Sequence, residues 1–132
     1  MQGMRQMILG ETKQTVADAC IEACTWCELA CLACAETCLG EMSSDELALC
    51  VQLSLDCAEV CWTTRKFVSD AIVVAPRLVK EQLEACALMC AATAAECFRQ
   101  RGLGAELMTC QHSCARCQRL CLSMQTHVAN LH

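Results

Sequence analysis

One stretch of the chain, residues 20–38, constrains the fold more than any other because it carries six cysteines at helical spacing. The sequence there reads CIEACTWCELACLACAETC, so the cysteines follow one another in steps of four, three, four, three and four residues. An α-helix turns once every 3.6 residues, and such steps put all six side chains on one stripe. In a helical bundle that stripe faces the core and usually consists of leucine, isoleucine and valine. The stretch therefore predicts a helix whose buried face is made of thiols.

The composition predicts an all-α protein. The chain has 132 residues, with no tyrosine, two tryptophans, two phenylalanines and one proline. Alanine, leucine, glutamate, glutamine and methionine favour helices and are abundant, whereas β-branched and aromatic residues are scarce. A chain of this length suits one domain with its own core. We expect a single domain over residues 1–132, with residues 1–10 as a loosely attached lead-in.

The periodicity predicts four helices, at about residues 11–39, 44–68, 76–101 and 105–129. Gly40 is placed to end the first helix. Ser43 and Glu46 form a capping box that opens the second helix, and Pro76 suits the first turn of the third. Helices of this length with short connections pack as antiparallel neighbours. The expected fold is an antiparallel up-down-up-down four-helix bundle with a cysteine-lined core.

All sixteen cysteines fall on inward-facing positions of these helices. A random scatter would place only about two in seven there. Met124 continues the same spacing after the last cysteine, whereas Ser54, Thr93 and Leu107 stand at inward positions where a further cysteine would fit. The candidate metal ligands are Cys20, Cys24, Cys27, Cys31, Cys34, Cys38, Cys50, Cys57, Cys61, Cys86, Cys90, Cys97, Cys110, Cys114, Cys117, Cys121 and Met124.

So many cysteines are also typical of a secreted disulfide scaffold. Three observations speak against that class. Residues 1–14 contain no apolar signal segment and no small-residue cleavage site. The expected connections between helices contain almost no cysteine, and cysteines one turn apart on one helix are poorly oriented for bridging. Metal-binding thiols in a reducing cytoplasm fit better.

The charge of the core favours Cu(I) over other metals. A Cys₄ zinc site carries a net charge of −2, and several such sites would bury charge that no inward-facing lysine or arginine balances. An iron–sulfur cluster needs four cysteines that converge, usually from loops. Cu(I) is soft and monovalent, and two or three thiolates satisfy it. At roughly one Cu(I) per cysteine the loaded core is neutral, because thiolates bridge neighbouring ions.

Other function classes fit less well. A zinc or general heavy-metal thiolate buffer would use the same cysteines. A thiol redox protein is suggested by Cys24–Cys27, Cys31–Cys34 and Cys114–Cys117, but these motifs lie in mid-helix without the helix N-terminus that activates a thiol. A purely structural helical module would pack better with leucine. We find no constellation for catalysis and expect no enzyme; the net charge of −5 gives no basic surface for nucleic acid, and no apolar run approaches a membrane span.

The helix over residues 11–39 carries a second apolar face, formed by Trp26, Leu29, Leu32 and Ala33. A helix that is apolar on both faces usually buries both, so we expect self-association through this outer face. The alternative is that the N-terminal segment folds back over it. The two ends of the bundle also differ. Polar and soft-ligand residues near Cys20 and Met124 favour that end as the place where copper enters, whereas leucines gather at the other. His112 and His127 are expected at the surface.

The run of six cysteines at residues 20–38 recurs in shorter form at Cys110–Cys121, followed by Met124, with sparser sets of three in residues 50–61 and 86–97. Over about residues 12–128 the sequence resembles the cysteine-rich four-helix-bundle copper storage proteins of bacteria, particularly the cytosolic branch without an export signal. The resemblance implies cytoplasmic storage of many Cu(I) ions inside the bundle. It also implies a homotetramer with one open end. A copper chaperone or a copper-requiring enzyme would be the exchange partner of such a store.

Overall fold

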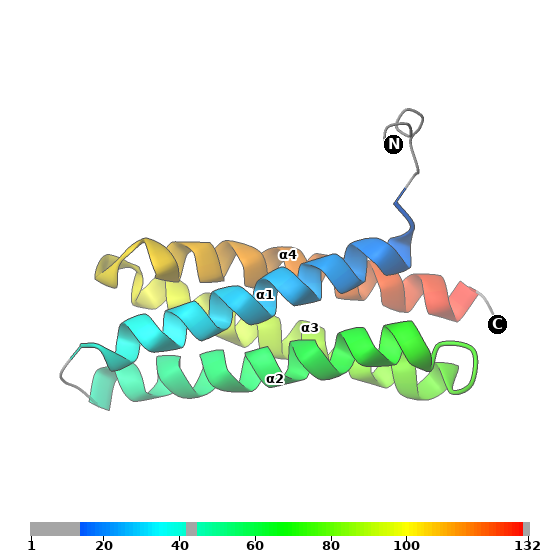
Figure 1. Cartoon of the computed structure of the whole chain (residues 1–132), viewed down its shortest axis with the longest axis horizontal. Coiled ribbons are helices and arrows are strands. Elements are labelled where there is room, and N and C mark those ends of the chain that lie inside the picture. The colour runs from blue at the N-terminus through cyan, green and yellow to red at the C-terminus, as the bar shows by residue number, and fades with distance from the viewer. Residues whose placement is uncertain (1–13, 42–44, 131–132) are drawn as a thin grey trace, which may run out of the picture.

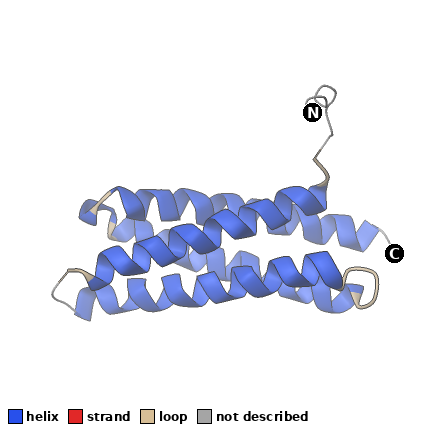
Figure 2. Ribbon diagram, viewed as in Figure 1, coloured by secondary structure: helices blue, strands red, loops and turns tan. Residues whose placement is uncertain are grey.

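The structure, a computed structural model, describes residues 14–41 and 45–130. Over these residues the chain forms α1 (Val16–Leu39), α2 (Ala48–Asp70), α3 (Pro76–Arg99) and α4 (Ala105–Asn130). Two short 3₁₀ turns, η1 (Asp45–Leu47) and η2 (Arg101–Leu103), lie at the same end of the molecule (Figure 1). Figure 2 shows helices joined by short connections, with no strand in the described residues. The predicted all-α bundle is confirmed.

The four helices run antiparallel and pack in a ring. α1 packs against α2 and α4, and α3 packs against the same two neighbours. Each consecutive helix returns along the previous one, so the up-down-up-down order holds (Figure 1). None of the described helices is long and apolar enough to cross a membrane.

α1 begins later than the periodicity predicted. Residues 11–13 lie outside the described part of the chain, and the helix starts at Val16. Thr15 has extended backbone angles and its hydroxyl accepts a hydrogen bond of 3.0 Å from the Asp18 amide. This is an N-cap, which satisfies one of the free amides of the first turn. The expected start near residue 11 was too early because residues 11–14 are polar and carry no apolar periodicity that would fix the helix boundary.

The other helix ends also differ in detail. α1 ends at Leu39 as predicted, and Gly40 is its C-cap, with right-handed backbone angles of φ −74° and ψ −15°. The predicted capping residue Ser43 lies outside the described residues, and α2 begins at Ala48, after η1, rather than near residue 44. α2 ends at Asp70, two residues later than expected. α3 begins at Pro76 as predicted but ends at Arg99, because Gln100 leaves the helical region with φ −99° and ψ 16°.

The core follows the inward-facing positions of the sequence. Every cysteine is at most 2% exposed. The other fully or almost fully buried side chains at inward positions are Leu47, Ser54, Thr64, Val68, Val79, Leu83, Thr93, Leu107, Met124 and Val128. Close packing of small thiols and alanines lets the helices approach one another. The core is therefore a narrow column of sulfur with apolar side chains at both ends.

Candidate metal centre

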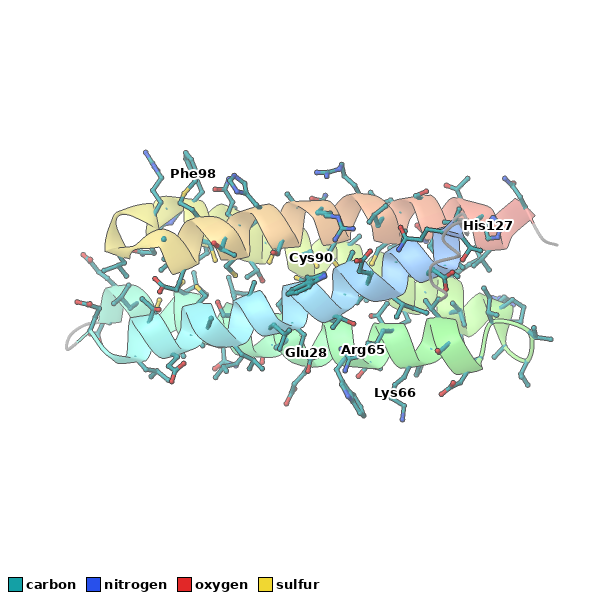
Figure 3. The ribbon with its side chains drawn as sticks, turned by 45° about the horizontal axis from the view of Figure 1, so that its top comes forward. Glu28, Arg65, Lys66, Cys90, Phe98 and His127 are labelled. Carbon is teal, nitrogen blue, oxygen red and sulfur yellow. The ribbon has the colours of Figure 1, made fainter. Side chains whose placement is uncertain are left out.

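All sixteen cysteines are free and buried in the structure. They come from all four helices and point toward the bundle axis, as Cys90 illustrates (Figure 3). Free cysteine behaves as a small apolar side chain with a weak S–H donor, so the thiols can pack against one another without metal. The geometry of these sulfur atoms decides what the core can bind.

Sulfur atoms pair across the bundle in a regular order. Between α1 and α4 the pairs are Cys24 with Cys117 at 3.7 Å, Cys27 with Cys114 at 3.6 Å and Cys31 with Cys110 at 3.7 Å. Between α2 and α3 they are Cys57 with Cys90 at 3.8 Å and Cys61 with Cys86 at 4.0 Å. Because neighbouring helices are antiparallel, successive pairs follow one another about one turn apart. We call this column the sulfur ladder.

Contacts between the two sides turn the ladder into overlapping groups. The Cys27 sulfur lies 3.9 Å from those of Cys57 and Cys90, and the Cys61 sulfur lies 3.9 Å from that of Cys117. Several groups of four have all sulfurs within 4.8 Å of one another, such as Cys27, Cys57, Cys61 and Cys90, and Cys61, Cys86, Cys90 and Cys117. These two groups share Cys61 and Cys90, so one thiolate can bridge two ions.

The sulfur separations suit low coordination numbers. At a metal–sulfur distance of about 2.3 Å, three sulfurs around one ion lie about 4.0 Å apart, and two sulfurs on opposite sides lie about 4.6 Å apart. The observed separations of 3.6 to 4.0 Å are close to the first arrangement. The second needs small rotations of the cysteine side chains. The core is therefore near the geometry of two- and three-coordinate thiolate sites before any metal binds.

The thiols influence one another's protonation. The pKa of Cys50 is lowered to about 3, chiefly because Cys34 donates a hydrogen bond to its sulfur, with Cys97 adding to the effect. The pKa of Cys38 is raised to about 12, chiefly by burial and then by its hydrogen bond with Cys50. Neighbouring thiols of one group therefore differ in how readily they release their protons. A group can offer one thiolate to an arriving cation and release further protons as more cations bind.

The described residues supply no basic side chain to balance thiolate charge inside the core. The only buried charged residue among them is Glu96, at 5% exposed. Its carboxylate pairs with Arg99 Nε at 3.0 Å and accepts from Gln100 Nε2 at 3.2 Å. Burying unpaired anions is strongly unfavourable. The positive charge of a thiolate-filled core must come from bound metal ions.

Met124 is fully buried, whereas His112 and His127 are exposed, as expected. His127 lies near the end of α4 in Figure 3. Beyond Met124, Val68, Val79 and Val128 are also buried. Apolar side chains therefore pack at this end, together with buried Thr64, whose hydroxyl accepts a hydrogen bond of 3.0 Å from Gln82 Nε2. The opposite end is closed by Leu47 and Leu107.

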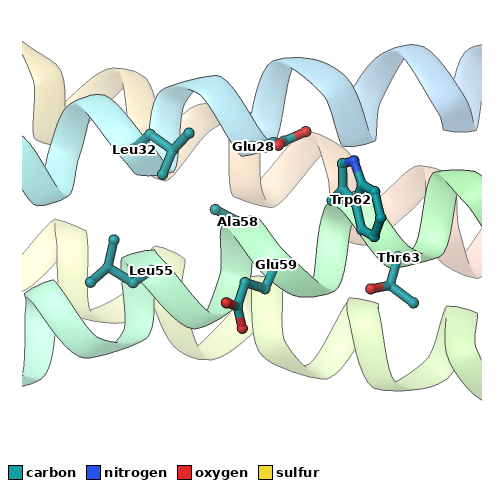
Figure 4. A pocket seen from close by; sticks show the side chains of 7 residues that line it. All are labelled: Glu28, Leu32, Leu55, Ala58, Glu59, Trp62 and Thr63. Atoms are coloured by element: carbon teal, nitrogen blue, oxygen red, sulfur yellow. The ribbon is translucent and has the colours of Figure 1, made fainter.

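The sequence analysis missed a surface feature beside α1. A groove of about 490 Å³ lies between α1 and α2 and is lined by Glu28, Leu32, Leu55, Ala58, Glu59, Trp62 and Thr63. Figure 4 shows Leu32 and Trp62 projecting from the two helices along it. Trp62 is 46% exposed and Trp26 on α1 is 56% exposed. The outer apolar face thus extends from α1 onto α2, which the spacing of a single helix could not indicate.

The sulfur-lined bundle has known relatives. The family model described as copper storage protein matches residues 13–127. This chain belongs to the copper storage protein family. A cytosolic copper storage protein from Streptomyces lividans, solved with five coppers, superposes with a TM-score of 0.80 at 33% identity, covering 84% of this chain and 92% of that one.

The family likeness extends to Bacillus subtilis. The Cu(I)-bound copper storage protein BsCsp3 superposes with a TM-score of 0.73 at 32% identity, covering 83% of this chain and 98% of that chain. An uncharacterised cysteine-rich protein, YhjQ, is 32% identical over 108 residues, covering 82% of this chain and 94% of its own length. This family member therefore shares its thiol-lined fold with proteins solved in copper-loaded form.

Proposed function

We propose that this protein stores Cu(I), with many ions held by bridging cysteine thiolates inside one domain that spans residues 1–132. The observation that carries the proposal is a core of sixteen buried free thiols, in which the sulfurs paired in the sulfur ladder lie 3.6 to 4.0 Å apart. Membership of the copper storage protein family and the copper-loaded relatives support it. The proposed ligands are all sixteen cysteines, with Met124 as an additional sulfur donor at the end of α4.

The charge of the core supports Cu(I) rather than zinc. Replacing each thiol proton by one Cu(I) leaves the buried column neutral, since every thiolate gains one positive charge. Four-coordinate zinc–thiolate sites would leave a net charge of −2 each in the same volume. With no basic residue buried among the described residues, that charge has no partner. We therefore expect roughly one Cu(I) per cysteine at full loading.

The store acts by holding ions rather than by catalysing a reaction. We propose a cytosolic location, as for the relative from Streptomyces lividans, and exchange of copper with a chaperone or a copper-requiring enzyme. We also propose that the protein self-associates, as a homotetramer, through the outer face of α1 and the adjoining groove. The exposed side chains of Trp26, Leu29 and Leu32 support this surface, since large apolar patches usually mark interfaces.

An anaerobic titration tests the proposal. Fully reduced apo-protein is titrated with Cu(I) in the presence of a chromogenic Cu(I) chelator. We expect the chelator to stay uncoloured until roughly one copper per cysteine has been added. A parallel zinc titration with a chromogenic zinc chelator serves as the control, and we expect it to saturate at far fewer ions. If the chelator takes copper after only one or two ions are bound, the protein is no copper store.

A further inference from the structure

The sulfur ladder is interrupted on one side. Along α2 and α3 the cysteine pair Cys57 and Cys90 should be followed by another pair before Cys50 and Cys97, but Ser54 and Thr93 stand there instead. Both are fully buried. The Thr93 hydroxyl donates to the Met89 carbonyl at 2.8 Å and lies 3.4 Å from the carbonyl of Leu53, the residue before Ser54. The two hydroxyls therefore lie at one level of the bundle, which we call the hydroxyl layer.

The hydroxyl layer offers no good ligand for Cu(I). Soft Cu(I) selects thiolate and thioether sulfur over hydroxyl oxygen. Thr93 uses its proton on the backbone of its own helix. The Ser54 hydroxyl oxygen is buried without a hydrogen-bond partner, so it stands as an isolated polar group in the core. Copper ions cannot follow the α2–α3 side of the ladder through this level.

On the α1–α4 side the same level is crossed by one pair of sulfurs, Cys31 and Cys110, 3.7 Å apart. Cys110 also lies 4.0 Å from Cys114 on the same helix, and Cys31 lies 3.7 Å from Cys114. Hydrogen bonding with Cys110 is also the largest of the influences that raise the pKa of Cys34 and Cys97, two thiols beyond the layer. Cys110 thus contacts Cys31 and Cys114, and Cys34 lies one turn beyond Cys31 on α1, so Cys110 lies at the level between the main column of sulfurs and the thiols beyond the layer.

The thiols beyond the layer form a compact group of their own. Cys34, Cys38 and Cys50 have all their sulfurs within 4.8 Å of one another, and the Cys97 sulfur lies 3.6 Å from that of Cys34. We call these four the end group. On the other side of the layer are eleven cysteines, the main group: Cys20, Cys24, Cys27, Cys31, Cys57, Cys61, Cys86, Cys90, Cys114, Cys117 and Cys121.

We propose that the hydroxyl layer divides the copper store into two compartments, the end group and the main group, and that Cys110 is the sulfur through which Cu(I) passes between them. This inference rests on the proposed copper storage. Transfer is a ligand exchange without redox change. Cu(I) forms a bond to the Cys110 thiolate as its bond to a sulfur on one side breaks, and the proton that Cys110 releases returns to the vacated thiolate.

The test is the rate at which copper leaves the loaded protein. Wild type loaded with Cu(I) is mixed anaerobically with excess chromogenic chelator, and the colour is followed in time. We expect two phases whose amplitudes divide roughly as four to eleven, in proportion to the cysteines of the two groups. Cys110→Ala should slow the slower of the two phases by about tenfold or more, because copper loses the sulfur through which it passes between the two groups. It removes the sulfur without adding a buried polar group.

Cys90→Ala is the matched control. It removes an equally buried sulfur from a level where three other cysteines remain, Cys27, Cys57 and Cys114. We expect it to lower the amplitude by roughly two coppers, because Cys90 belongs to two groups of sulfurs, without slowing either phase. Far-ultraviolet circular dichroism of each apo variant checks that the bundle is folded.

A second variant adds sulfur to the hydroxyl layer and does not depend on Cys110→Ala folding. Ser54→Cys combined with Thr93→Cys should merge the two phases into one, and it should restore fast release when added to Cys110→Ala. The two-compartment proposal is wrong if Cys110→Ala and Cys90→Ala release copper at equal rates, or if the added-cysteine variant keeps two unchanged phases. Neither result would contradict copper storage. If wild type fails to withhold copper from the chelator at the start, the storage proposal itself fails.

Discussion

Cys27 on α1 and Cys114 on α4 hold their sulfur atoms 3.6 Å apart at mid-bundle. The same Cys27 sulfur lies 3.9 Å from Cys57 on α2 and 3.9 Å from Cys90 on α3. Cys27 is thus a junction at which sulfurs from all four helices meet. Its thiolate is placed to share ions with three neighbours, so its loss should affect more than one copper site.

Replacement of this junction should lower the copper capacity by more than the one sulfur removed. For Cys27→Ala we expect a loss of roughly two to three Cu(I) ions, because each bridged ion loses a ligand. Cys20→Ala removes a cysteine near the end of the ladder and should lose about one ion. Anaerobic titration against a Cu(I) chelator measures both. Equal losses in the two variants would contradict the junction.

The reduced apo-protein should lose stability at alkaline pH. Burial and the hydrogen bond with Cys50 raise the pKa of Cys38 from 9.0 to about 12. Above pH 9 the unfolded chain releases this proton while the folded chain keeps it, so unfolding becomes more favourable as the pH rises toward 12. Below pH 9 both states hold the proton, and this group contributes no pH dependence.

Cys50 has the opposite effect on stability, and its effect changes only below pH 9. Its pKa is lowered to about 3, so its stabilising contribution is complete at pH 9 and is lost only as the pH falls toward 3. Denaturant unfolding of reduced apo-protein at pH 7, 9 and 10.5 should therefore show a falling midpoint over the last step. The copper-loaded protein has no thiol protons to lose and is the control. If the unfolding midpoint of the apo-protein instead rises between pH 9 and pH 10.5, the buried thiols are already ionised in the folded protein.

The sequence predicted the core because cysteine spacing reports directly on the helix face. Each inward position that the sequence analysis named in α2, α3 and α4, including Ser54, Thr93 and Leu107, is buried in the structure. The helix ends were less accurate. The N-cap at Thr15 and the turn η1 depend on local hydrogen bonds that the apolar pattern does not record.

The pairing of sulfurs between helices could not be predicted in the same way. Which cysteine of α4 faces Cys27 depends on the length and geometry of three connections, which set the shift of each helix along its neighbour. The hydroxyl layer shows the consequence. Ser54 and Thr93 were each noticed in the sequence as inward positions without cysteine, but only the register of α2 against α3 shows that they occupy the same level.

Met124 provides a test of the proposed sulfur donor at the end of α4. It is fully buried, and a thioether binds Cu(I) without releasing a proton. Met124→Leu conserves volume, so we expect the apo stability to change by less than about 1.5 kcal/mol. The copper capacity should fall by about one ion. Met89→Leu, at a half-buried position on α3, is the control. An unchanged capacity in Met124→Leu would assign Met124 to packing alone.

Self-association should depend on the apolar surface shared by α1 and α2. Leu29 is 52% exposed on α1, and Trp62 on α2 is 46% exposed beside the groove (Figure 4). A carboxylate placed in a desolvated interface has no partner and is strongly unfavourable. We therefore expect Leu29→Glu and Trp62→Glu each to shift the protein to a smaller assembly, measured by sedimentation velocity.

Leu88→Glu is the control for added charge, because Leu88 is 66% exposed on α3 and does not line the groove. It should leave the assembly unchanged. Copper capacity per chain should also stay constant in all three variants, because the sulfur ladder lies inside one bundle. A wild-type protein that sediments as a monomer, or a Leu88→Glu variant that dissociates as readily as Leu29→Glu, would exclude the α1–α2 surface as the interface.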